Sequence, residues 1–145
     1  MKVGFTGTRQ DTTCEQFSAL CRVVALLDVR EWHHGCCIGA DAESLEVVTE
    51  YAPGARLVAH PPESNALLSE MALGDSDEVR GRKPYLERNR DIVNETETLV
   101  ACPKGPEELR SGTWSTVRFA RKRCKRIVII FPDGTVHNEN AEGAA

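Results

Sequence analysis

Short apolar runs alternate along this chain with longer stretches in which apolar residues recur every three or four positions. The short runs predict β-strands at residues 2–6, 31–34, 55–59, 97–102 and 126–131. The recurring spacing predicts helices at residues 13–27, 41–51, 84–94 and 112–123, with a partly helical surface excursion around residues 65–72.

Strands that alternate with helices predict an α/β fold. We expect a Rossmann-like, doubly wound, mostly parallel sheet of about five strands with helices on both faces. Residues 1–136 are expected to form a single domain, and residues 137–145 a flexible polar tail. Ligands of such sheets bind beyond the carboxyl ends of the strands, so the residues that follow each strand are the candidates for chemistry.

Composition narrows the class of protein. The chain has 145 residues, of which 28% are charged, and a formal net charge of −4, values typical of one soluble cytoplasmic domain. No apolar run approaches the roughly 20 residues of a membrane span, and no signal-peptide pattern opens the chain, so no membrane partner is expected. The six cysteines lack C-x-x-C and C-x-x-H spacings, which predicts reduced, mostly buried thiols, no metal site and no cofactor.

The loop after the first predicted strand contains Gly7, Thr8 and Arg9. Glycine lets the backbone approach a ligand closely, and arginine offers a bidentate fork for phosphate or carboxylate. The alternative is a tight turn with a solvated arginine.

The loop after the second predicted strand contains His34, Gly35, Gly39 and Asp41, and it leads into a helix. Such a loop presents free backbone N–H groups to an anion, although its glycine spacing matches neither the dinucleotide fingerprint nor the Walker loop. The alternatives are that His34 packs in the core and that Asp41 caps the helix.

Two further motifs lie on the predicted helices. Tyr85 and Arg88 are three residues apart and therefore side by side, and Arg90 follows, an arrangement that suits a base or a sugar phosphate but also occurs on solvated helix faces. Residues 111–114 open the last helix with hydroxyls and free N–H groups that can hold a phosphate or act as a plain N-cap. They are Ser111, Gly112, Thr113 and Trp114.

The net charge is unevenly distributed. The segment from Arg118 to Arg126 holds six cations and no acid, so the rest of the chain carries a formal charge of −10. The segment is either a solvated helix C-terminus or a route for nucleic acid whose binding would weaken steeply with salt.

The order of these motifs resembles the Rossmann-like superfamily that joins the DNA-processing Smf (DprA) proteins with the LONELY GUY phosphoribohydrolases. The similarity spans residues 2–131 and rests on Gly7-Thr8-Arg9, Gly35 to Asp41, Arg88-Asn89-Arg90 and Ser111-Gly112-Thr113. The resemblance implies a pocket for a nucleotide or nucleotide-derived ligand, such as a nucleoside phosphate or an ADP-ribose-like molecule, and relatives usually form homodimers or higher homo-oligomers.

The resemblance also separates three functions. In the LONELY GUY enzymes an arginine, matched here by Arg88, and a glutamate after G-G-x-G-T cleave an N-glycosidic bond. That glutamate has no match here, and Asp41, Glu43 or Glu78 would have to supply a carboxylate from elsewhere. Arg88-Asn89-Arg90 and Ser111-Gly112-Thr113 stand closer to the Smf proteins, which bind single-stranded DNA. We therefore expect nucleotide binding first, with an N-glycosidase or deoxyribosyltransferase-like enzyme using Arg88 and Asp41, or a single-stranded DNA module, as alternatives.

Overall fold

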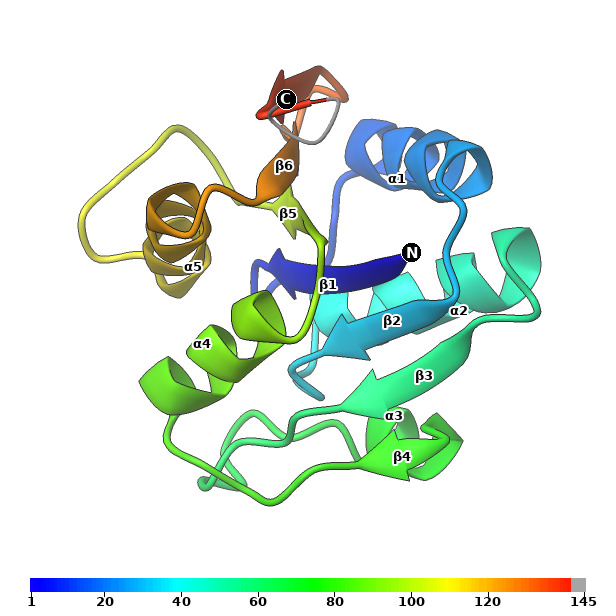
Figure 1. Cartoon of the computed structure of the whole chain (residues 1–145), viewed down its shortest axis with the longest axis vertical. Coiled ribbons are helices and arrows are strands. Elements are labelled where there is room, and N and C mark those ends of the chain that lie inside the picture. Colours follow the sequence, from blue (N-terminus) through cyan, green and yellow to red (C-terminus); the bar gives the residue numbers. More distant parts are fainter. Residues whose placement is uncertain (142–145) are drawn as a thin grey trace.

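A seven-stranded sheet forms the centre of the computed structural model, which describes residues 1–141 (Figure 1). The strands are β1 (Lys2–Gly7), β2 (Glu31–His34), β3 (Arg56–Ala59), β4 (Glu78–Val79), β5 (Thr98–Cys102), β6 (Arg126–Ile130) and β7 (Val136–Glu139). They lie in the order β4-β3-β2-β1-β5-β6-β7, and every neighbouring pair is parallel except β6 and β7.

Helices cover both faces of the sheet. They are α1 (Cys14–Leu26), α2 (Ala40–Tyr51), α3 (Glu70–Asp75), α4 (Tyr85–Asn94) and α5 (Gly112–Lys122). One hydrophobic cluster joins α1, α2 and α3 to one face, and a second joins α4 and α5 to the other (Figure 1). The predicted Rossmann-like α/β fold, with helices on both faces of a mostly parallel sheet, is confirmed.

Successive residues of strand β1 face the helix layers on opposite sides of the sheet. Val3 and Phe5 point into the cluster with α1 and α2, and Phe5 stacks on Trp32 at 5.5 Å between ring centroids. Gly4 points the other way, where a Cβ would come within 2.8 Å of Ile92 and 2.9 Å of Thr96. Glycine at this position therefore lets α4 pack directly on the central strand.

Hydroxyl side chains fix where three helices begin. The hydroxyl oxygens of Thr13, Ser69 and Ser111 accept hydrogen bonds from the backbone N–H three residues later, at 3.0, 3.1 and 3.2 Å. Each bond satisfies one of the N–H groups that a helix leaves without a partner in its first turn. These caps place the starts of α1, α3 and α5 at the boundaries that the structure shows.

Differences from the sequence expectations lie at the edges of the fold. The five predicted strands are present, but β4 and β7 extend the sheet to seven strands. The helix expected near residues 65–72 starts later, at Glu70, because Leu68 forms a β-bridge with Cys37. Strand β7 reaches into the segment expected to be a polar tail, and residues 142–145 lie outside the described part of the chain.

The six cysteines divide into two groups. Cys36, Cys37 and Cys102 are buried, whereas Cys14 and Cys124 are exposed and Cys21 is half-buried. Within residues 1–141 no helix has both the length and the apolar character needed to cross a membrane.

Candidate functional site

A pocket of about 330 Å³ opens at the carboxyl ends of β1 and β5. The chain adds β2, β3 and β4 on one side of β1 and then returns to place β5 on the other side. This is the switch in strand order at which open α/β sheets bind ligands. The residues around the pocket come from the loops after β1, β2 and β5 and from the helices α2, α4 and α5.

Most of the predicted site residues meet in this pocket. The ten that line it are Gly7, Thr8, Arg9, Gly35, Asp41, Tyr85, Arg88, Ser111, Gly112 and Thr113. They are drawn from four separate parts of the sequence, so the fold brings together positions that the chain keeps as much as 106 residues apart.

The loop after β1 is tied to both of its neighbours. The N–H of Thr8 donates to the backbone oxygen of Cys102 at 2.9 Å, and the backbone oxygen of Thr8 accepts from the N–H of Ala40 at 3.0 Å. A Cβ at Gly7 would come within 2.6 Å of the Ala40 side chain. Glycine at this position therefore lets the start of α2 pack against the loop that presents Arg9.

Gly35 separates the two charged side chains at the base of the pocket. A Cβ at this position would collide with Nη1 of Arg88 and come within 2.7 Å of Oδ2 of Asp41. Glycine is therefore required for both charged groups to pack against the backbone of the β2–α2 loop at this position. Asp41 does not cap its own helix, as the sequence had allowed, because Gly39 occupies the N-cap position.

Asp41 instead holds the loop that precedes α2. Its Oδ2 accepts a hydrogen bond from the backbone N–H of Cys37 at 3.2 Å. Burial raises the pKa of Asp41 to about 6, although the Arg88 guanidinium and the backbone N–H groups of Cys37 and Gly35 pull it down. The carboxyl group is therefore able to exchange a proton close to neutral pH.

Arg88 is only 6% exposed and is held by neutral partners. Its Nη1 donates to the backbone oxygen of Gly35 and, at 3.2 Å, to that of His60, while Nε donates to Oδ1 of Asn89 at 2.7 Å. Both Nη atoms also contact the Cys37 sulfur, at 3.7 and 3.8 Å. Within residues 1–141 no carboxylate lies within 4 Å of this fixed cation, which stands beside Asp41 at the base of the pocket.

Tyr85 lies between two guanidinium groups. Its ring centroid is 5.4 Å from Cζ of Arg9 and 5.2 Å from Cζ of Arg88. Cation–π contacts of this length orient both arginines without neutralising either of them. Arg9 is exposed and has no carboxylate within 4 Å in residues 1–141, so its planar fork remains available to a ligand.

The start of α5 forms the opposite wall. Ser111 caps the helix, and Gly112 and Thr113 bring its first turn to the pocket. The β5–α5 loop adds Lys104, whose Nζ lies 3.9 Å from Oε1 of Glu108. Backbone N–H groups in the first turn of a helix and nearby cations together favour an anion.

Four predicted residues lie outside the pocket lining. His34 is fully buried and bonds the Ser76 hydroxyl at 2.8 Å, Trp114 packs in the second core cluster, and Arg90 lies over the Phe119 ring. Gly39 has φ = 87° and packs behind the loop after β1, where a Cβ would collide with the backbone of Arg9. His34 thus packs in the core, the alternative that the sequence left open, because its side chain is directed to the end of α3 rather than to the pocket.

Sequence reasoning left out several residues that do line the pocket. They are Phe5, Thr6, Gln10, Cys37, Asn89, Ile92, Lys104, Glu108 and Arg110. Lys104, Glu108 and Arg110 follow a predicted strand, so the rule that ligands bind at the carboxyl ends of strands would have found them. The same rule covers Cys37, which lies in the loop after β2, and Asn89 stands inside the Arg88-Asn89-Arg90 motif, whereas the place of Ile92 depends on how α4 packs.

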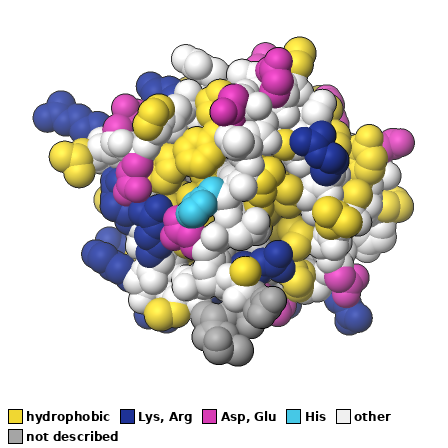
Figure 2. All heavy atoms as spheres, turned by 90° about the horizontal axis from the view of Figure 1, so that it is seen from above, with side chains coloured by type: hydrophobic (Ala, Val, Ile, Leu, Met, Phe, Trp, Pro, Cys, Tyr) yellow, Lys and Arg dark blue, Asp and Glu magenta, His cyan; other side chains and the backbone are white. Residues whose placement is uncertain are grey.

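Two of the six cations in the segment from Arg118 to Arg126 are paired with carboxylates in residues 1–141. Arg118 and Arg121 both bind Glu107, at 3.2 and 3.0 Å, and Arg121 also binds Glu139 at 2.8 Å. In Figure 2 the Lys and Arg side chains gathered at one side of the face stand among Asp and Glu side chains. The fold therefore offsets part of the positive charge of the segment, through Glu107 and Glu139.

Comparison with known proteins reveals a relationship of fold. No protein-family model and no curated protein matches the chain. The X-ray structure of DNA processing protein A (DprA) from Streptococcus pneumoniae is similar to it, with a TM-score of 0.66 and 17% sequence identity. The match covers 98% of this chain and 52% of DprA, so the chain spans about half the length of that protein. The chain therefore has the Rossmann-like fold found in DprA, as its resemblance to the superfamily containing the Smf proteins predicts.

Proposed function

We propose that the pocket binds a single nucleotide unit, with its phosphate directed to the start of α5 and to Arg9. The observation that carries this proposal is the convergence of two anion-binding loops, a helix N-terminus and the cations Arg9, Arg88, Lys104 and Arg110 on one cavity. Its volume of about 330 Å³ lies at the small end of ligand pockets, which favours one nucleotide over a dinucleotide.

Binding of nucleoside 5′-monophosphates, measured by calorimetry beside the matching nucleosides, tests the proposal. We expect the monophosphate to bind at least about tenfold more tightly than the nucleoside, because a charge-assisted contact contributes roughly 1.5–3 kcal/mol. The Arg9→Ala variant should lose most of that difference. Arg30→Ala is the matched control, since Arg30 is exposed and precedes β2 at the opposite edge of the sheet.

Gly35→Ala tests the base of the pocket, because its methyl group would meet Arg88 and Asp41. We expect at least a tenfold loss of nucleotide affinity, while Gly81→Ala, where a Cβ meets nothing within 4 Å, should keep it. Equal affinity for nucleosides and nucleotides, or no binding at millimolar concentration, would refute the proposal.

A single-stranded DNA module is the second candidate, favoured by the similarity of almost the whole chain to DprA, a protein named for DNA processing. In this case the nucleotide unit belongs to a DNA strand. An oligodeoxynucleotide that binds at least tenfold more tightly than the monophosphate, and loses affinity in Arg9→Ala, would support this function over binding of free nucleotides.

The position of the Asp41 carboxyl group in the pocket favours a third candidate function, hydrolysis of an N-glycosidic bond. The sequence lacks the expected glutamate, but the buried Asp41 carboxyl, with its pKa of about 6, lines the pocket beside Arg88. Release of free base from a nucleoside monophosphate, lost in Asp41→Asn, would support an enzyme. Tight nucleotide binding without release of base would exclude this activity.

A further inference from the structure

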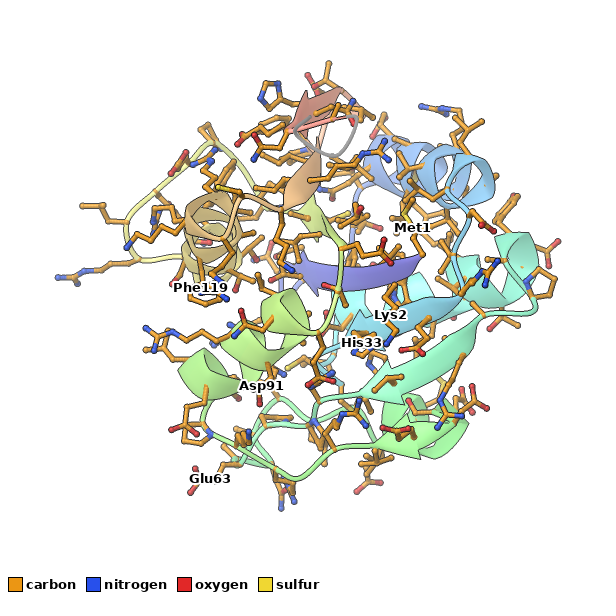
Figure 3. All side chains as sticks on the ribbon, in the orientation of Figure 1. Met1, Lys2, His33, Glu63, Asp91 and Phe119 are labelled. Atoms are coloured by element: carbon orange, nitrogen blue, oxygen red, sulfur yellow. The ribbon has the colours of Figure 1, made fainter. Side chains whose placement is uncertain are left out.

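Two histidines and a glutamate meet between the sheet and the end of α4, away from the nucleotide pocket. His33 lies on β2, His60 follows β3, and Glu95 is the C-cap of α4. One potential ligand atom from each residue lies within 4.8 Å of the other two. Figure 3 places His33 between β2 and the C-terminal end of α4.

We propose that His33, His60 and Glu95 form a binding site for a divalent transition-metal ion, with Zn²⁺ the best match to their donor atoms. Two imidazole nitrogens and one carboxylate oxygen are a recurrent zinc-binding set that leaves a fourth position for water. The sequence gives no spacing signal for this site, because its ligands come from three separate elements.

The geometry requires only a small rearrangement. Nδ1 of His33 and Nε2 of His60 are 2.8 Å apart, whereas two nitrogens bound to a tetrahedral zinc ion are about 3.3 Å apart at a Zn–N distance of about 2.0–2.1 Å. The two rings are tilted at 35°, so a small rotation of each ring opens the pair. Both imidazoles are nearly completely buried, at 1% and 2% exposed.

Glu31 supplies the outer contact that zinc-bound histidines usually have. Its Oε1 accepts a hydrogen bond from Nε2 of His33 at 2.9 Å. Since Nε2 carries the proton, Nδ1 has its lone pair directed at His60, and a carboxylate–histidine pair of this kind orients the ligand and raises its basicity. His60 must move its own proton from Nε2 to Nδ1 when the metal binds.

The charges around the site are balanced and the site is accessible. Arg80 donates through Nε and Nη2 to Oε1 of Glu95, at 3.2 and 2.7 Å, which leaves the second carboxylate oxygen for the ion. The Glu95 side chain is 34% exposed, so an ion can enter beside it.

An ion at this position would connect to the nucleotide pocket through one backbone group. The backbone oxygen of His60 accepts from Nη1 of Arg88 at 3.2 Å. Metal binding would therefore fix the carbonyl that positions the buried arginine, while the ion itself remains outside the cavity.

A calorimetric titration with Zn²⁺ tests the proposal. The full chain is first treated with a chelator and dialysed to remove bound metal. We expect one ion per chain, and at least tenfold weaker binding in Glu95→Gln, which keeps an oxygen for Arg80 but removes the anionic ligand. Glu31→Gln should weaken binding by about 10–100-fold through His33. Glu97→Gln is the matched control, because Glu97 lies near the same edge but bonds the backbone of Lys2.

Titration with Co²⁺ separates this site from the cysteines. Histidine and carboxylate ligands give visible d–d bands without the near-ultraviolet charge-transfer band of a thiolate. Binding that shows a thiolate band, that is unchanged in both Glu95→Gln and His60→Ala, or that is absent at micromolar Zn²⁺ would overturn the proposal. Glu95→Gln keeps the test decisive if His60→Ala fails to fold, since Glu95 is partly exposed.

Discussion

At the scale of single residues, two buried ionisable groups, His34 and Asp41, make opposite contributions to the pH dependence of stability. His34 is completely buried, and its ring makes two hydrogen bonds: Nδ1 accepts from the backbone N–H of Cys36, and Nε2 donates to the Ser76 hydroxyl. Burial lowers the pKa of His34 to about 3, while burial raises the pKa of Asp41 to about 6. Burial thus favours the neutral form of both groups, by lowering the proton affinity of His34 and raising that of Asp41.

These two shifts predict opposite slopes of stability against pH. Between pH 3 and 6.5 the unfolded chain binds more protons at His34 than the folded chain, so this residue makes stability rise with pH. Between pH 4 and 6 the folded chain binds more protons at Asp41, so this residue makes stability fall with pH. We expect His34→Gln to flatten the profile between pH 4 and 6 and Asp41→Asn to steepen it, each by up to about 1.4 kcal/mol per pH unit.

Urea unfolding at a series of pH values measures both slopes. Comparing slopes rather than absolute stabilities removes the constant cost of each substitution. A change of the same sign in the two variants would contradict the assignment of His34 and Asp41 as buried groups with oppositely shifted pKa values.

At the scale of elements, the sequence predicts those parts of the fold whose signals are local. Thr13 and Ser111 mark helix starts because a hydroxyl cap acts within three residues, and the spacing of apolar residues predicts that both segments are helical. Strand β4 has two residues and no hydrophobic period of its own, so only its pairing with β3 defines it. The His33–His60–Glu95 cluster was missed for a related reason, since packing of three elements creates it.

Two serine caps allow the structural and the binding roles of a helix start to be separated. Ser111 caps α5 and lines the pocket, whereas Ser69 caps α3 and does not line it. We expect Ser111→Ala and Ser69→Ala each to lower the free energy of unfolding by about 1 kcal/mol. Only Ser111→Ala should also weaken nucleotide binding. Equal losses of nucleotide affinity in the two variants would mean that the start of α5 does not contact the ligand.

At the scale of the whole molecule, the fold redistributes the charge that the sequence displays. The segment from Arg118 to Arg126 holds six cations, and Glu107 from the β5–α5 loop and Glu139 from β7 bind two of them, Arg118 and Arg121. Four cations and two carboxylates line the pocket, in a chain whose formal net charge is −4. The pocket and the basic segment are therefore two separate concentrations of positive charge on the folded molecule.

Salt dependence of binding to single-stranded DNA distinguishes the two routes. Each phosphate contact releases counterions and contributes about 0.7 to the slope of log K against log salt for a single strand. We expect Lys104→Ala and Arg110→Ala each to reduce this slope by about 0.7, because both residues line the pocket. Lys122→Ala is the matched control, an exposed cation of α5 that faces the second, smaller groove between α4 and α5. If Lys122→Ala reduces the slope while the two pocket variants leave it unchanged, the strand follows α5 and the pocket does not take part in DNA binding.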